Sequence, residues 1–187
     1  MSLTIPTLLT LLRIVMIPVL VVVFYLPVDW ASAAAVVIFA LAGITDWLDG
    51  WIARRYGMAS TFGAFLDPVA DKLMVSVALI IIVQRHPEIV LALSTAVIIG
   101  REVTISALRE WMAALGEGAR VKVAWTGKIK TILQMVAIGF LLYGEPLWII
   151  PVLEIGRWLL VAAAVLTILS MFTYLRAAWP AIRGPAD

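Results

Sequence analysis

Six long apolar segments, separated by short polar breaks, make up almost the whole chain. Each approaches the roughly 20 residues that an α-helix needs to cross a bilayer. The segments run approximately over residues 6–26, 30–51, 61–84, 88–112, 126–143 and 147–175. Proline, glycine and acidic residues mark the breaks, as at Pro27 with Asp29. The pattern predicts an all-α integral membrane protein, with six transmembrane helices in a single domain over residues 1–187.

The composition agrees with a membrane protein and narrows the chemistry. The chain is 64% hydrophobic and 14% charged, whereas a soluble domain carries about 25% charged residues. There is no cysteine, which excludes disulfides and thiolate metal sites. Arg13, the following apolar run and the small residues at 31–33 have some features of a signal peptide. The residues before Arg13 are mainly Leu, Thr and Ile rather than basic, so we expect this segment to be kept as the first membrane helix.

Lysine and arginine gather at alternate connections between the apolar segments. They follow the second segment, lie between the fourth and fifth, and recur at the C-terminal end: Arg54, Arg55, Arg109, Arg120, Lys122, Lys128, Lys130, Arg176 and Arg183. The opposite connections carry only Arg85 and Arg157. By the positive-inside rule, both termini and the connection after the second segment face the cytoplasm of a cell (inner) membrane.

The most informative stretch runs from Asp46 to Asp71 and holds four of the six aspartates in the chain. Asp46 and Asp49 are three residues apart, and Asp67 and Asp71 four apart, so each pair shares one face of a helix. Two helices meeting across these faces would gather four carboxylates, whose oxygens suit hard cations such as Mg²⁺ or Mn²⁺. The simpler alternative is that the carboxylates are solvated or paired with neighbouring basic side chains. Acidic residues in membrane segments are costly and are usually functional, which favours the metal site.

The spacing of these residues matches a known signature. It reads Asp46-x2-Asp49-Gly50-x2-Ala53-Arg54-x8-Gly63-x3-Asp67-x3-Asp71, which resembles the motif of the CDP-alcohol phosphotransferases at all eight fixed positions. The resemblance implies that family's six-helix membrane fold and a site for two divalent cations, held by Asp46, Asp49, Asp67 and Asp71. It also implies transfer of a phosphatidyl group from CDP-diacylglycerol, or a related CDP-alcohol, to an acceptor hydroxyl, with release of CMP. Asp71 would in addition be the general base, as the catalytic residue that takes the acceptor's proton.

Further residues are expected to bind the CDP-lipid. Gly50, Ala53 and Gly63 lack bulk and would allow the nucleotide to approach closely, although a glycine in a membrane helix often serves helix packing. Arg54 offers forked donors to a phosphate or to the cytosine edge. The remaining candidates are Ser60, which is equally well explained as a helix N-cap, and Thr10 and Arg13 in the opening segment. That opening resembles the branch of the family that uses glycerol-3-phosphate.

A second basic stretch bears on the acceptor. Arg101, Ile105 and Arg109 share one helical stripe, and Lys128 and Lys130 begin the fifth segment. Together Arg101, Arg109, Lys128 and Lys130 could bind the phosphate of an acceptor. The alternative is ordinary positive-inside anchoring, with Glu102 and Glu110 simply paired to these arginines. This stretch also resembles the glycerol-3-phosphate branch, so the expected substrates are CDP-diacylglycerol and the sn-1 hydroxyl of glycerol-3-phosphate.

Two competing functions stay open on the sequence alone. The same chemistry could serve inositol phosphate, serine or a phosphatidyl lipid as acceptor. Alternatively, intramembrane carboxylates could mark a divalent-cation or proton transporter, for which Gly50, Arg54 and Gly63 have no evident role. Membrane lipids are expected partners and nucleic acid is not. A homodimer through the third and fourth helices is an option that the pattern leaves open.

Overall fold

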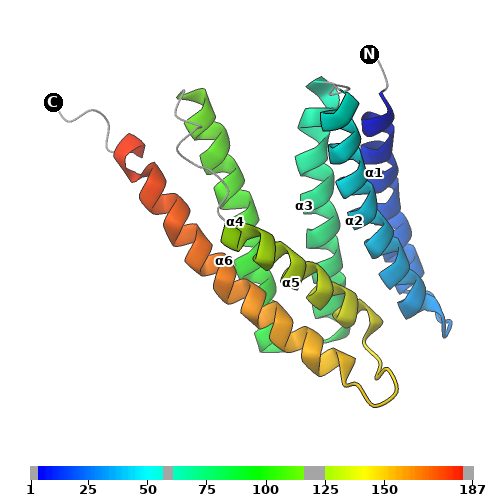
Figure 1. Cartoon of the computed structure of the whole chain (residues 1–187). Helices are drawn as coiled ribbons and strands as arrows, with labels where there is room; N and C mark the ends of the chain where they lie inside the picture. The colour runs from blue at the N-terminus through cyan, green and yellow to red at the C-terminus, as the bar shows by residue number, and fades with distance from the viewer. Residues whose placement is uncertain (1–3, 57–60, 116–124, 183–187) are drawn as a thin grey trace. The chain divides into compact units, whose positions relative to one another are not determined.

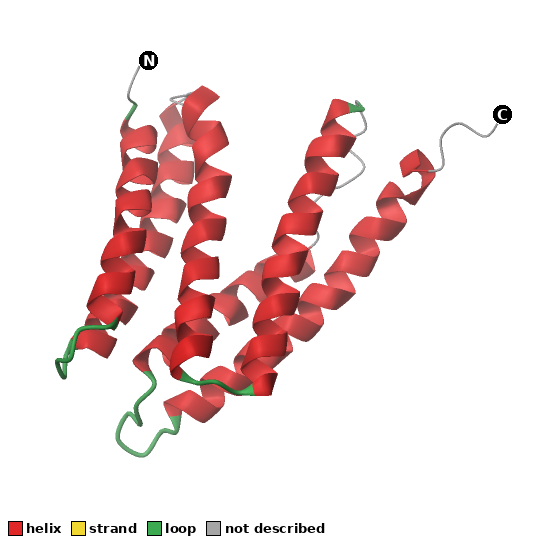
Figure 2. Ribbon diagram, turned by 180° about the vertical axis from the view of Figure 1, so that it is seen from behind, coloured by secondary structure: helices red, strands yellow, loops and turns green. Residues whose placement is uncertain are grey.

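The computed structural model describes residues 4–56, 61–115 and 125–182. Its elements in chain order are α1 (Ile5–Phe24), α2 (Ala31–Tyr56), α3 (Thr61–Arg85), α4 (Ile89–Ala114), α5 (Trp125–Tyr143) and α6 (Val152–Ile182) (Figure 1). Figure 2 shows in green the described connections, which join α1 to α2, α3 to α4 and α5 to α6. The prediction of six helices is therefore confirmed for the described part of the chain.

Two helix boundaries differ from the predicted bounds, and the first of them bears on the site. α2 continues to Tyr56, so Gly50, Ala53 and Arg54 all lie within the helix that carries Asp46 and Asp49. α6 begins only at Val152, because residues 144–151 form a tight turn closed by backbone hydrogen bonds between Leu147 and Ile150 at 3.1 and 3.0 Å. The predicted last segment, residues 147–175, included residues 147–151 of this turn because they are largely apolar.

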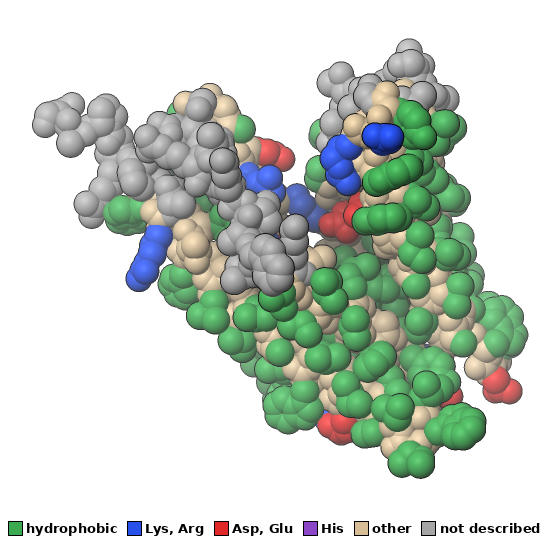
Figure 3. Space-filling model, in the orientation of Figure 1, with side chains coloured by type: hydrophobic (Ala, Val, Ile, Leu, Met, Phe, Trp, Pro, Cys, Tyr) green, Lys and Arg blue, Asp and Glu red, His purple; other side chains and the backbone are tan. Residues whose placement is uncertain are grey.

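Four helices are long and apolar enough to cross a membrane, namely α1, α2, α4 and the Val152–Arg176 part of α6. The apolar part of α5 is shorter and runs from Ile129 to Tyr143. α3 carries Asp67, Asp71 and Lys72 in its first half, which lowers its hydropathy. Hydrophobic side chains cover much of the lower part of the view in Figure 3, as expected for helices that contact lipid.

The chain divides into two compact units. The first contains Met1–Arg85 and Ile138–Leu153, and the second contains His86–Ala137 and Glu154–Asp187. In the first unit α1 packs against both α2 and α3, around side chains such as Leu20, Ala35 and Leu79 that are fully buried. The small Ala35 lets the helix backbones approach closely, which is how membrane helices commonly pack. This packing brings polar residues of three helices together near the beginning of α1.

Candidate active site

The first functional group lies on α1 and its neighbours. Thr10 and Arg13 are three residues apart, on the side of α1 that is buried against α2 and α3. Their side chains are 0% and 1% exposed. A charged side chain so deeply buried in an apolar helix needs a partner of opposite charge.

The partners of Arg13 are the two aspartates of α2. Arg13 Nη1 donates to Asp46 Oδ1 at 2.8 Å, and Arg13 Nη2 donates to Asp49 Oδ2 at 2.5 Å. The Asp49 side chain is 3% exposed and that of Asp46 is 48% exposed. The predicted pairing of these aspartates on one helix face is thus seen in the structure, where one guanidinium bridges both carboxylates.

Asp67 of α3 adjoins the same buried side of α1. The Thr10 hydroxyl donates to Asp67 Oδ1, and Asp67 lies close enough to Asp49 to interact with it electrostatically, as does Asp46. Asp71 follows one turn later on α3 and has an exposed side chain. Thr10, Arg13 and the two aspartate pairs therefore belong to one region of the first unit.

The donor chemistry of this region fits divalent cations. Arg13 carries one positive charge and bridges two carboxylates, Asp46 and Asp49, and carboxylate oxygens are preferred ligands of Mg²⁺ and Mn²⁺. Within residues 4–56, 61–115 and 125–182, no group of three or more histidine or acidic side chains is arranged so as to hold a metal ion. Arg13 is placed where a cation shared by Asp46 and Asp49 would compete with it.

The remaining candidates for CDP-lipid binding are placed as follows. A Cβ added to Gly50 would lie 3.1 Å from Arg54 Nη1, so the Arg54 side chain folds back over Gly50 along α2. The small residue at position 50 makes room for this guanidinium. Ala53 is partly exposed and Gly63 is buried. Ser60 lies outside the described residues.

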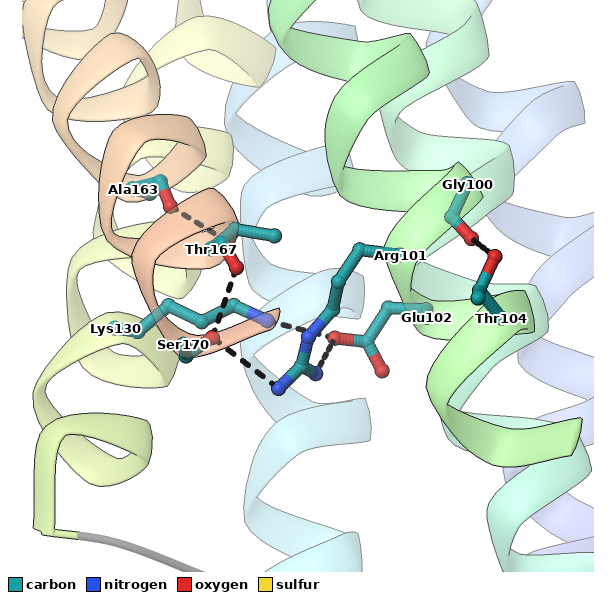
Figure 4. Close-up of polar contacts among 8 residues, drawn as sticks. All are labelled: Gly100, Arg101, Glu102, Thr104, Lys130, Ala163, Thr167 and Ser170. Atoms are coloured by element: carbon teal, nitrogen blue, oxygen red, sulfur yellow. Dashed lines mark hydrogen bonds and ion pairs between the residues drawn. The ribbon is translucent and has the colours of Figure 1, made fainter. Parts of the chain in front are cut away.

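The second functional group belongs to the second unit. Glu102 Oε1 accepts hydrogen bonds from Arg101 Nη1 at 2.9 Å and from Lys130 Nζ at 2.7 Å (Figure 4). Two of the predicted acceptor-phosphate residues, Arg101 on α4 and Lys130 on α5, are thus brought together by one carboxylate. Arg109 has an exposed side chain farther along α4, and the side chain of Lys128 lies outside the part that the structure describes.

Two features of these groups were not predicted from the sequence. Ser170 and Tyr174 of α6 contact Arg101, through a hydrogen bond from Arg101 Nη2 to Ser170 Oγ at 3.4 Å and a guanidinium–ring distance of 5.4 Å. Arg13 pairs with carboxylates, whereas the sequence suggested an anionic ligand for it. The sequence signal for the α6 contacts is a pair of hydroxyl residues three apart, Thr167 and Ser170, within the apolar middle part of the helix.

Comparison with known proteins bears on what these groups are for. The family model described as CDP-alcohol phosphatidyltransferase matches residues 3–169. The chain belongs to this family. The resemblance inferred from the aspartate spacing is confirmed, and the family's name is that of a transferase, as predicted.

Relatives within the family are similar along their whole length. The CDP-diacylglycerol–glycerol-3-phosphate 3-phosphatidyltransferase of Shigella flexneri serotype 5b (strain 8401) is 50% identical over 178 residues, which cover 95% of this chain and 96% of the relative. The protein of the same name from Escherichia coli (strain K12) has the same identity and coverage. Arg13, the four signature aspartates, Arg101 and Lys130 all lie within residues 3–169, which the family model matches.

Proposed function

We propose that this protein transfers the phosphatidyl group of CDP-diacylglycerol to the sn-1 hydroxyl of glycerol-3-phosphate, giving phosphatidylglycerophosphate and CMP. The observation that carries the proposal is the complete family signature, three of whose aspartates accept hydrogen bonds from Arg13 and Thr10 of α1. The choice of acceptor is supported by relatives that are named for this reaction and are 50% identical over 95% of the chain.

The reaction is a substitution at the β-phosphorus of CDP-diacylglycerol. The sn-1 oxygen of the acceptor forms a bond to this phosphorus, the bond from phosphorus to the bridging pyrophosphate oxygen breaks, and CMP leaves with both electrons of that bond. Asp71 takes the proton of the attacking hydroxyl. Its exposed carboxylate on α3 suits this role, because a general base must reach substrate and then return its proton to water.

Asp46, Asp49, Asp67 and Asp71 would hold two divalent cations, Mg²⁺ or Mn²⁺. Bound there, such cations neutralise the pyrophosphate and stabilise charge on the entering and leaving oxygens. Two residues of α1 contact these carboxylates. Arg13 offsets one of the two negative charges of Asp46 and Asp49, and Thr10 orients Asp67 by hydrogen bonding to its Oδ1.

Arg54 and Gly50 would contact the CDP part of the donor. Arg54 is exposed and lies along the same helix face as Gly50, so its guanidinium can leave Gly50 and donate to a phosphate oxygen or the cytosine edge. Once Arg54 has moved, no side chain covers Gly50, and the nucleotide can approach the helix backbone there. Ala53, Gly63 and Ser60 complete the proposed donor site.

Arg101 and Lys130 would bind the phosphate of glycerol-3-phosphate, with Arg109 and Lys128 adding positive charge along the same two helices. Arg101 is 12% and Lys130 is 4% exposed. Anchoring at a membrane surface would leave such side chains in water or among lipid headgroups, so their burial favours a binding role.

The proposal also places the protein in the membrane. All six helices would cross a cell (inner) membrane, with both termini and the aspartates on the cytoplasmic side, where glycerol-3-phosphate is available. The distribution of lysine and arginine supports this orientation. A homodimer is compatible with the exposed apolar side chains, since the same faces suit lipid or a second copy.

The test is CMP release by the purified protein in detergent, with CDP-diacylglycerol, Mg²⁺ and one acceptor at a time. We expect turnover with glycerol-3-phosphate and little or none with serine or inositol phosphate. Asp71→Asn should lower kcat by at least about 100-fold, which is the usual contribution of a general base. Asp29→Asn, outside the signature in an exposed turn, is the matched control and should be unchanged. Preference for another acceptor would refute the acceptor assignment and leave the chemistry intact.

A further inference from the structure

One oxygen atom of Glu102 holds two cationic side chains from neighbouring helices. The distances from Oε1 are 2.9 Å to Arg101 Nη1 and 2.7 Å to Lys130 Nζ, and both are within the range of strong charge-assisted hydrogen bonds. Two like charges that share a single oxygen would otherwise repel each other and separate. Glu102 therefore fixes the spacing of the two groups proposed to bind the acceptor phosphate.

Side chains of α6 fix the orientation of the same guanidinium. Ser170 Oγ donates to the Thr167 carbonyl oxygen at 2.9 Å, so its lone pair is directed to Arg101 Nη2. The ring of Tyr174 lies 5.4 Å from the guanidinium carbon of Arg101, within the range of a cation–π contact. Figure 4 shows the Arg101 guanidinium between Glu102 and Ser170.

The cluster retains unused binding capacity for an anion. It contains two cations and one carboxylate, and is defined here as Arg101, Glu102, Lys130, Ser170 and Tyr174. Arg101 Nε is buried and has no hydrogen-bond partner among the described residues. A buried donor without an acceptor is costly, and so is a buried positive charge without a counter-ion. A phosphate monoester, with several oxygens and up to two negative charges, would satisfy both.

We propose that Glu102 is a positioning residue for the acceptor phosphate: its Oε1 holds Arg101 and Lys130 at the spacing that one phosphate bridges, while Ser170 and Tyr174 of α6 set the direction of the guanidinium. This inference rests on the proposed use of a phosphate-bearing acceptor. It assigns a part of acceptor recognition to α6 and to an acidic side chain, whereas sequence patterns pointed to the basic residues of α4 and α5 alone. Selectivity for a phosphate monoester over an uncharged alcohol follows from this preassembled pair.

The test compares Glu102→Ala and Glu102→Gln with the matched control Glu110→Gln, an exposed glutamate on the same helix. Glu102→Ala should raise KM for glycerol-3-phosphate by about tenfold or more, as expected for losing charge-assisted hydrogen bonds. KM for CDP-diacylglycerol should stay within about twofold, because a purely structural defect would move both constants together. Glu102→Gln should fall between wild type and Glu102→Ala, since its amide oxygen still accepts from both cations but carries no charge. Glu110→Gln should match wild type.

A second measurement does not depend on turnover. Inorganic phosphate should raise the thermal unfolding midpoint of the wild-type protein and of Glu110→Gln, but not that of Glu102→Ala. Equal protection of wild type and Glu102→Ala, or no protection of the wild type, would overturn the inference. So would parallel changes in the two KM values.

Two further outcomes have a defined meaning. If Glu102→Ala does not fold, Ser170→Ala decides, since removing one weak hydrogen bond should raise KM for glycerol-3-phosphate about two- to fivefold. An unchanged KM in Ser170→Ala would then count against the inference. A wild-type protein that releases no CMP with glycerol-3-phosphate would refute the proposed function. The shift of the unfolding midpoint by phosphate would then still test whether the cluster binds phosphate.

Discussion

Replacing Arg13 by methionine removes the positive charge that Asp46 and Asp49 share and keeps most of the apolar stem that packs between the helices. Without the guanidinium, the buried carboxylate of Asp49 is left in the packed interface of α1 and α2, beside the half-exposed Asp46. The consequence should depend strongly on whether divalent cations are present, because cations at the same carboxylates supply the missing charge.

The magnitude follows from the burial of the two partners. Asp49 is 3% exposed, and stranding one partner of a buried ion pair costs about 3–5 kcal/mol. Asp46 is 48% exposed, so its pair adds at most about 1 kcal/mol. For a chain of this size, each kcal/mol shifts the unfolding midpoint by roughly 2–4 °C. We therefore expect the Tm of Arg13→Met in EDTA to fall by on the order of 10 °C.

Magnesium should reverse much of this loss. A cation present at about 100 times its dissociation constant stabilises the folded state by about 2.7 kcal/mol. In the wild type the gain should be smaller, because a cation bound by Asp46 and Asp49 must first displace Arg13. Arg13→Met should therefore show the larger rise in Tm when Mg²⁺ replaces EDTA.

Thermal unfolding of the detergent-solubilised proteins, followed by intrinsic tryptophan fluorescence, is a suitable assay. Arg85→Met is the matched control, because Arg85 of α3 donates to Ser32 Oγ at 3.0 Å and lies 5.1 Å from the Phe24 ring centroid rather than on a carboxylate. It should lower Tm by a few degrees at most, whether or not Mg²⁺ is present. The reasoning fails if Arg13→Met unfolds within about 2 °C of the wild type in EDTA, or if Mg²⁺ stabilises both proteins equally.

Two other substitutions separate stability from activity. Gly50→Ala should be neutral or stabilising by up to about 1 kcal/mol in thermal unfolding, because the added Cβ meets only the flexible end of Arg54. The KM of this variant for CDP-diacylglycerol should rise. An unchanged KM would argue against close approach of the nucleotide at Gly50. Arg157→Met removes hydrogen bonds to Glu88 at 2.6 Å and to Glu154 at 2.7 Å. Because these partners are partly exposed, it should cost about 1 kcal/mol of stability and leave kcat unchanged, and a selective loss of kcat would show that this contact between α4 and α6 matters for the chemistry.

The helices were predictable because each apolar run is long and ends at turn residues. α3 was predicted to span residues 61–84 and is observed at Thr61–Arg85. α6 was less well predicted, since the residues from Leu147 to Ile150 are apolar yet turn back on themselves, with Trp148 at a φ of 57°. Apolar content indicates that a segment is buried in lipid or protein, but it does not indicate whether the backbone continues as a helix or turns.

The aspartate pairs were predictable for a different reason. Spacings of three and four residues place side chains on one helix face whatever the helix packs against. In the structure, Asp46 and Asp49 form ion pairs with the same side chain. That partner, Arg13, is 33 residues away, and Glu102 meets Lys130 across 28 residues. Such contacts depend on which helices become neighbours, which periodicity within one helix does not specify.

The central claim is most directly tested by identifying the lipid product. Wild-type protein in liposomes containing CDP-diacylglycerol would be supplied with Mg²⁺ and carbon-13-labelled glycerol-3-phosphate, and the lipids and CMP would be quantified by mass spectrometry. We predict labelled phosphatidylglycerophosphate and CMP in equal amounts. CMP without a labelled lipid, or a labelled lipid without CMP, would contradict direct transfer of the phosphatidyl group to glycerol-3-phosphate.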